Sequence, residues 1–206
     1  MSKRPLLILG STSRYRRELL ERLRLPFEVH APDVDETPRP GERPAGLAQR
    51  LALAKAHAVS ALHPDAVVIG SDQVADLDGT PIGKPGTHEN AVAQLRSMRG
   101  RSVVFQTAVA VVRASTGHVG TALVPVTVRF RALSDAEIEH YLRTEQPYDC
   151  AGSAKCETLG IALLDAIESD DPTALVGLPL IRTSALLRAA GIDPLRPDDA
   201  GAGAAP

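Results

Sequence analysis

Apolar residues along this chain follow two patterns, short unbroken runs and longer stretches with helical spacing. The runs at 5–9 and 66–70 are typical of buried strands, and residues 27–31 also predict a strand. The stretches at 13–24 and 45–62 predict helices, and the second stretch is rich in Ala and Leu, which favour helix formation. The first half of the chain is therefore expected to alternate strands with helices.

Turn and capping signals divide the second half. The Asp78-Gly79 dipeptide lies between apolar runs and predicts a β-hairpin. Thr87 is suited to begin a helix that reaches residue 98, and Ser134 begins another with Glu137 as its capping-box partner. Thr87, Ser134 and Glu137 each supply a side-chain oxygen that can accept a hydrogen bond from the backbone at a helix start.

The remaining segments complete the expected fold. Residues 32–44 are polar and rich in proline, which predicts an irregular loop. Residues 102–130 predict two long strands around a Ser-Thr-Gly turn, residues 161–168 fit either a strand or a helix, and residues 177–191 predict a final helix. The fold class is therefore α/β, a long mixed β-sheet flanked by helices.

Composition excludes several classes of function. The 206 residues include 23 basic and 25 acidic side chains, and this balance argues against nucleic acid as a partner. No apolar run is long enough to span a membrane or to act as a signal peptide, so we expect a soluble cytoplasmic protein. Cys150 and Cys156 are too few to form a disulfide framework.

Three arginines stand in the first turn of the first predicted helix, where acidic residues are normally favoured. A helix N-terminus and arginine forks together can bind phosphate oxygens. Alternatively, each arginine could point into solvent or meet a glutamate on the helix face. This alternative is favoured for Arg14, whereas phosphate binding is favoured for Arg16 and Arg17, which follow Ser11 and Ser13.

Other charged residues each allow more than one interpretation. Asp72 is expected just past the end of a buried strand, as a metal ligand, a base or a turn residue. Glu36 could bind a hard cation such as Mg²⁺, although alone it reads better as part of a solvated acidic loop. Lys84 lies between Gly83 and Pro85 after the hairpin, and Lys55 could extend to solvent from its Ala-Leu helix.

Taken together, these residues form a recognisable set of motifs: Ser-x-Ser-x-x-Arg-Arg, Val-Asp-Glu, Lys-Ala, Gly-Ser-Asp-Gln and Gly-Lys-Pro. The set resembles the Maf family of nucleoside triphosphate pyrophosphatases from Leu6 to Leu195. The resemblance implies two lobes with the active cleft between them and one domain over residues 1–195. Residues 196–206 lie outside the resemblance and have little apolar surface to bury, so they are expected to form a disordered tail. It also implies a nucleoside triphosphate substrate, a divalent cation (Mg²⁺ or Mn²⁺) and a homodimer.

The resemblance also implies roles for individual residues. Asp72 matches the catalytic proton acceptor, and Glu36 matches a metal-binding carboxylate, with Asp72 as the second metal ligand. The cations and the N-terminal motif match phosphate-binding positions: Lys55, Lys84, Ser11, Arg16 and Arg17. Charge neutralisation by cations and a base for water are what hydrolysis at the α-phosphorus needs.

Three further positions bear on the nucleotide. Tyr15, Gln73 and Glu157 resemble the family branch that prefers 7-methyl-GTP, although we expect Trp at position 15 in that branch. An aromatic ring can stack on the positively charged methylated base, and a carboxylate can accept hydrogen bonds from the guanine edge. The alternatives are a dTTP/UTP pyrophosphatase and a nucleotide-binding regulator of septum formation.

Overall fold

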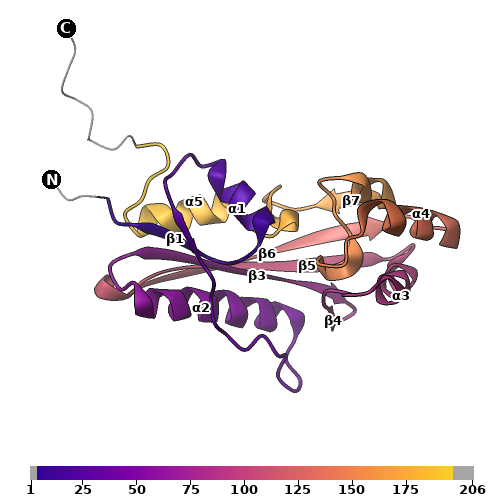
Figure 1. Cartoon of the computed structure of the whole chain (residues 1–206), viewed down its shortest axis with the longest axis horizontal. Coiled ribbons are helices and arrows are strands. Elements are labelled where there is room, and N and C mark those ends of the chain that lie inside the picture. Colours follow the sequence, from indigo (N-terminus) through magenta and orange to yellow (C-terminus); the bar gives the residue numbers. More distant parts are fainter. Residues whose placement is uncertain (1–3, 197–206) are drawn as a thin grey trace, which may run out of the picture.

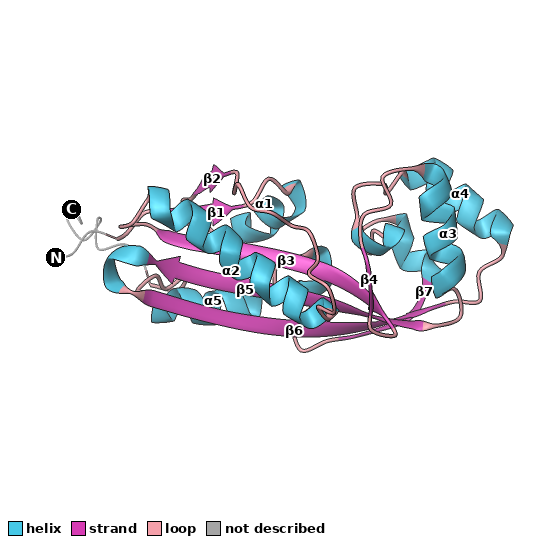
Figure 2. Ribbon diagram, turned by 90° about the horizontal axis from the view of Figure 1, so that it is seen from below, coloured by secondary structure: helices cyan, strands magenta, loops and turns pink. Residues whose placement is uncertain are grey.

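In the computed structural model, which describes residues 4–196, one mixed β-sheet extends along most of the molecule (Figures 1 and 2). Its strand order is β2-β1-β3-β5-β6-β7, with β4 paired to β3. Strand β1 pairs in parallel with β2 and β3, and the other pairs are antiparallel. The strands are β1 (Leu7–Gly10), β2 (Glu28–His30), β3 (Val67–Leu77), β4 (Thr80–Ile82), β5 (Ser102–Arg113), β6 (His118–Phe130) and β7 (Leu164–Glu168).

The described part of the chain contains five α-helices, which are distributed over two lobes. In the first lobe, α1 and α5 cover one face of the sheet and α2 covers the other (Figure 1). The second lobe holds α3 and α4 beside β4 and β7, and the long strands β3, β5 and β6 join the two lobes (Figure 2). The helices are α1 (Arg14–Glu21), α2 (Pro44–Leu62), α3 (His88–Met98), α4 (Asp135–Glu145) and α5 (Leu180–Ala189).

Each covered face of the sheet has its own apolar core. Helices α1 and α5 pack leucines against β1, β3 and β5, while the small side chains of α2 pack on the opposite face. Helix α2 crosses β3 closely at Gly70, where an added Cβ would lie 2.3 Å from the carbonyl oxygen of Ala52. A side chain at position 70 would push the helix away, so Gly70 sets how near α2 approaches the strand.

Most of the predicted elements are confirmed, as is the α/β fold class. The hairpin forms at Asp78 and Gly79, which both have positive φ, as expected for its tight turn. Thr87 accepts a hydrogen bond from the backbone of α3, and Ser134 forms the predicted capping box with Glu137. The ambiguous segment at 161–168 contains the end of a 3-10 helix, Leu159–Leu163, and the strand β7.

Three predicted boundaries are wrong, the first because α1 ends at Glu21 instead of residue 24. Asp72 does not follow a strand but lies inside β3, because antiparallel pairing with β5 continues to Asp76 after the pairing with β1 ends at Gly70. The last helix begins at Leu180 instead of residue 177, since Gly177 has a φ of 117° and Pro179 precedes the first helical turn.

Two other predictions concern the chain as a whole. No helix within residues 4–196 has both the length and the apolar character needed to cross a membrane. The predicted tail at 196–206 lies outside the described residues except for Arg196. The assignment of residues 1–195 to one domain stays a prediction.

Candidate active site

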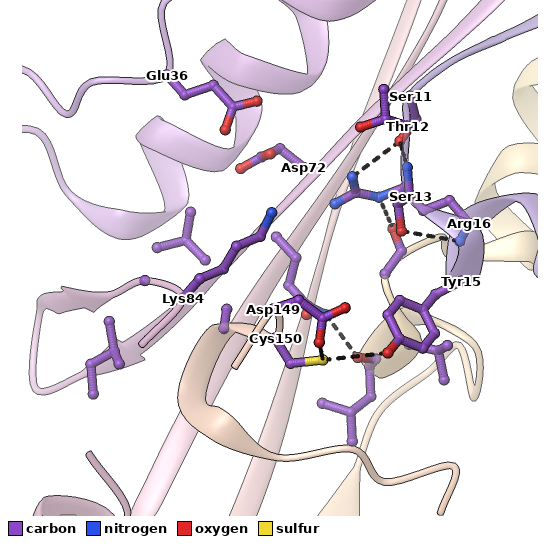
Figure 3. A pocket seen from close by; sticks show the side chains of 18 of the residues that line it. Ser11, Thr12, Ser13, Tyr15, Arg16, Glu36, Asp72, Lys84, Asp149 and Cys150 are labelled. Atoms are coloured by element: carbon purple, nitrogen blue, oxygen red, sulfur yellow. Dashed lines mark hydrogen bonds between the residues drawn. The ribbon is translucent and has the colours of Figure 1, made fainter. Parts of the chain in front are cut away.

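A cavity of about 680 Å³ lies between the two lobes (Figure 3). Its walls come from the β1–α1 turn, the loop after β2, helix α2, strands β3 and β4, and the segments that follow α4 and β7. Nine of the ten predicted site residues line it: Ser11, Tyr15, Arg16, Glu36, Lys55, Asp72, Gln73, Lys84 and Glu157. The fold therefore collects residues that are up to 146 positions apart (157 minus 11) into one cavity.

Lys55 joins the two carboxylates that were predicted as metal ligands. Its Nζ donates to Asp72 Oδ1 at 2.7 Å and lies 2.7 Å from Glu36 Oε1. The side chains of Lys55 and Asp72 are buried, whereas that of Glu36 is 58% exposed. The close crossing of α2 over Gly70 brings Lys55 to Asp72, two residues further along β3. Lys55 therefore points into the site and does not extend to solvent.

The charges around Glu36 keep it ionised. Burial raises the pKa of this carboxyl, but the hydrogen bond from Lys55 and the charges of Lys55, Lys84 and Arg16 outweigh burial and bring the pKa below its ordinary value. Figure 3 shows Lys84 extending from the opposite wall towards Asp72. The carboxylates are thus surrounded by cations from both lobes.

Arg16 is fixed beside the start of α1. Its Nε donates to the carbonyl oxygen of Gly177 at 2.9 Å, and its Nη1 donates to Ser11 Oγ at 3.4 Å. Ser13 caps α1 by accepting from the backbone of Arg16 (Figure 3). Burial lowers the pKa of Arg16, while Asp72 and Glu36 raise it. A guanidinium and a helix N-terminus therefore face the same cavity, which suits an anionic group.

Arg17 is not brought to the cavity. Its side chain is 63% exposed and forms an i,i+4 pair with Glu21 at 3.1 Å. Helical spacing separates the two arginines, because Arg16 lies three and four residues before the buried Leu19 and Leu20, whereas Arg17 lies four residues before the exposed Glu21, with which it pairs. Arg17 points away from that face.

Gln73 supports the wall that follows β7. Its amide nitrogen lies 2.9 Å from Thr107 Oγ1 and within 3.0 Å of the carbonyl oxygens of Ala174 and Leu175. The adjacent Ser71 donates to the carbonyl oxygen of Gly177 at 2.9 Å. Strand β3 thus holds the 174–177 turn against the cavity, and Arg16 binds the same turn.

Tyr15 reaches from the first lobe to the second. Its hydroxyl accepts a hydrogen bond from Arg14 at 2.7 Å and contacts Cys150 Sγ at 3.8 Å. Asp149 lines the cavity beside this contact, and Glu157 lines it from the same segment after α4. Burial raises the pKa of Tyr15, so the phenol stays protonated at neutral pH.

The sequence reasoning missed three residues that line this end of the cavity. Arg14 is exposed, as expected, and it also lines the cavity with its guanidinium over the Tyr15 ring, 4.7 Å from the centroid. The local sequence around Asp149 and Cys150 carries no motif that marks them, because only the packing of the second lobe brings them opposite Tyr15.

The donor set of the cavity fits a hard divalent cation. Glu36 and Asp72 place one oxygen each within 2.7 Å of the same atom, Lys55 Nζ. Among residues 4–196 no group of three or more His, Cys, Asp or Glu side chains could enclose a metal ion. Two carboxylates without a full cage are what Mg²⁺ commonly uses when substrate phosphates and water supply its other ligands.

In this α/β fold a mixed β-sheet joins two lobes, and the cavity between them holds cations and paired carboxylates. Such a site is suited to phosphoanhydride substrates. Residues 6–190 match the family described as Maf-like protein. The chain belongs to the Maf family.

Several relatives are similar over nearly the whole chain. The 7-methyl-GTP pyrophosphatase of Polaromonas sp. strain JS666 is 70% identical over 191 residues, covering 93% of this chain and 87% of that protein. The proteins of the same name from Albidiferax ferrireducens and Cupriavidus metallidurans are 69% and 61% identical, covering 90% and 91% of this chain and 94% of each relative.

Proposed function

We propose that this protein hydrolyses 7-methyl-GTP to 7-methyl-GMP and diphosphate. The observation that carries the proposal is the composition of the cavity between the lobes, which holds cations, carboxylates and an aromatic side chain. The relatives named 7-methyl-GTP pyrophosphatase, at 61–70% identity, support the same reaction.

The triphosphate of the nucleotide is bound by the cations that line the cavity. Arg16 lies at the N-terminus of α1, and Lys84 extends from the other wall, so their charges approach a triphosphate from two directions. Ser11 supplies a hydroxyl in the turn between β1 and α1. Fixed donors of this kind stabilise the charge that develops on phosphate oxygens in the transition state.

Asp72 acts as the base. A water oxygen attacks the α-phosphorus, its proton passes to the Asp72 carboxylate, and the bond from the α-phosphorus to the bridging oxygen breaks to release diphosphate. Lys55 holds Asp72 by its 2.7 Å hydrogen bond, so the carboxylate keeps one orientation. The burial of both side chains limits the access of other water molecules.

Glu36 and Asp72 would hold a divalent cation, Mg²⁺ or Mn²⁺, which would supply charge neutralisation at the phosphates and a more acidic water. Lys55 already neutralises part of the charge of the two carboxylates. Its ammonium would have to share these oxygens with the cation, which favours a cation that dissociates readily when substrate is absent.

The methylated guanine of the nucleotide is bound at the other end of the cavity from the phosphates. Tyr15 offers a ring face to the positively charged methylated guanine, and Glu157 offers a carboxylate to its N1–H and N2–H edge. Gln73 shapes this end by holding the 174–177 turn. Asp149 adds a further negative charge beside Tyr15, which favours a cationic base over a neutral pyrimidine.

We also propose that the protein acts in the cytoplasm and forms a homodimer. Both cysteines, Cys150 and Cys156, are free thiols, which is typical of a reducing compartment. The homodimer rests on the resemblance to the Maf family alone, and a mass measurement in solution would test it.

An end-point assay tests the reaction and the substrate together. The protein would be incubated with Mg²⁺ or Mn²⁺ and with 7-methyl-GTP, GTP, dTTP, UTP or CTP, and diphosphate would be measured separately from phosphate. We expect diphosphate to form fastest from 7-methyl-GTP and not to form with Asp72→Asn. Preference for dTTP or UTP would keep the chemistry and change the substrate. Nucleotide binding without diphosphate release would favour a regulatory role.

A further inference from the structure

Glu36 lies in a loop that has no regular structure of its own. Residues 31–43 connect β2 to α2 without a helix or strand, and the Glu36 side chain is 58% exposed. A side chain in such a loop normally samples many positions, and ordering it costs conformational entropy. Something outside the loop must therefore fix its backbone if the carboxylate is to meet a cation at one point.

Arg50 of α2 binds both ends of the segment that follows Glu36. Its Nε and Nη2 donate to the two oxygens of Glu42 at 2.6 and 2.7 Å, and Nη2 also donates to the carbonyl oxygen of Thr37 at 3.1 Å. Only 20% of the Arg50 side chain and 13% of the Glu42 side chain are exposed. We call this arrangement the Arg50–Glu42 clasp.

Two backbone amides make further hydrogen bonds within the loop. The Arg39 amide donates to Glu42 at 3.0 Å, and the Thr37 amide donates to Asp35 Oδ1 at 2.9 Å. Hydrogen bonding by Arg50 lowers the pKa of Glu42 to about 2, so its carboxylate is charged at neutral pH. The residues on both sides of Glu36 are thus held while its own carboxylate faces Lys55.

We propose that Arg50 is a positioning residue that holds Glu36 at the cation site, an inference that rests on the proposed function. Arg50 does not line the cavity and acts through Thr37, the next residue after Glu36. Helix α2 carries both Arg50, which fixes the loop backbone, and Lys55, which meets the carboxylate. One rigid helix therefore sets the position of Glu36 relative to Asp72.

This role requires arginine and not just a positive charge. The planar guanidinium donates three hydrogen bonds in a fixed geometry, two to Glu42 and one to Thr37. A lysine ammonium cannot reproduce this geometry. Arg50→Lys is therefore the informative variant, because it keeps the charge and removes the geometry. Arg96→Lys is its matched control, since Arg96 makes a similar fork to Asp135 at 3.1 and 2.9 Å between α3 and α4, outside the cavity.

The experiment measures Mn²⁺ binding by the electron paramagnetic resonance signal of free Mn²⁺. A non-hydrolysable α,β-methylene analogue of 7-methyl-GTP is present in the sample. Since removal of groups that orient metal ligands typically costs 10- to 100-fold in affinity, we expect the Mn²⁺ dissociation constant to rise about tenfold in Arg50→Lys and not in Arg96→Lys. Amide hydrogen exchange over residues 36–42 should become faster in Arg50→Lys alone. Unchanged Mn²⁺ affinity in Arg50→Lys would overturn the proposal.

A double-variant cycle separates positioning from a general loss of structure. If Arg50 acts through Glu36, then adding Arg50→Lys to Glu36→Ala should weaken Mn²⁺ binding no further. An equal loss in both backgrounds would show that Arg50 acts by another route. If the wild-type protein releases no diphosphate, the proposed function fails; if it is active but Arg50→Lys binds Mn²⁺ normally, only this inference fails.

Discussion

The ammonium of Lys55 donates a hydrogen bond to the carboxylate of Asp72 at 2.7 Å, and both side chains are buried. Asp72→Asn keeps the size of the side chain and an oxygen that can still accept from Lys55, but it removes the base. We expect turnover of 7-methyl-GTP to fall at least about 10²-fold, as is typical when a general base is lost. The melting temperature should stay close to that of the wild type.

Asp76→Asn is the control for that change, because Asp76 lies on the same strand but does not line the cavity. Diphosphate release and thermal unfolding would be measured for both variants. Full activity in Asp72→Asn would exclude this carboxylate as the base, whereas a large fall in melting temperature would mean that the variant reports on folding.

Tyr15→Ala should weaken discrimination between 7-methyl-GTP and GTP. Stacking of an aromatic ring on a cation contributes about 0.5–2 kcal/mol, so the ratio of kcat/KM for the two substrates should fall by about 2- to 30-fold. Tyr15→Phe keeps the ring but loses the contacts of the hydroxyl with Arg14 and Cys150, and it should keep the preference. Equal losses on both substrates in Tyr15→Ala would refute recognition of the charge.

The motifs in the sequence led to residues that line the cavity because they lie next to recognisable strand and helix ends. Ser11, Arg16 and Lys84 follow turns that local signals mark, and all three line the cavity. The position of Asp72 inside β3 could not be predicted locally, because the strand continues through pairing with β5, more than thirty residues further on (Asp72 pairs with Ala108).

Contacts between distant segments were beyond the sequence patterns. The 174–177 turn reaches the cavity through hydrogen bonds to Gln73, Ser71 and Arg16, each about a hundred residues or more away in the sequence. The approach of Asp149 to Tyr15 depends in the same way on how the two lobes pack. Periodicity describes which face of an element is buried, but it carries no information on which element covers that face.

Asp171 is a buried carboxylate beside the 174–177 turn that binds Thr173 and the start of α5, and its removal should reduce the stability of the protein. It is 1% exposed; one oxygen accepts from the backbone and hydroxyl of Thr173, and the other accepts from the amides of Ile181 and Arg182 at the start of α5. Asp171→Ala leaves these donors without their acceptor, so the free energy of unfolding should fall by about 2–4 kcal/mol.

Urea unfolding would measure this change, with Asp170→Ala as the control because Asp170 is an exposed neighbour. KM should also rise in Asp171→Ala, since the turn that binds Arg16 through Gly177 loses its support. A stability equal to that of Asp170→Ala would show that other groups hold the turn.

The two thiols should differ in how a bound nucleotide protects them. Burial raises the pKa of Cys150 to about 11 and that of Cys156 to about 12, so little reactive thiolate exists at neutral pH. Alkylation by iodoacetamide should therefore be slow at pH 7 and rise about tenfold per pH unit while the native fold persists. Cys150 lines the cavity whereas Cys156 does not, so 7-methyl-GMP should slow the alkylation of Cys150 alone. Mass spectrometry of the two peptides would measure both rates, and equal protection of both thiols would mean that the nucleotide closes the whole segment after α4 instead of covering Cys150 directly.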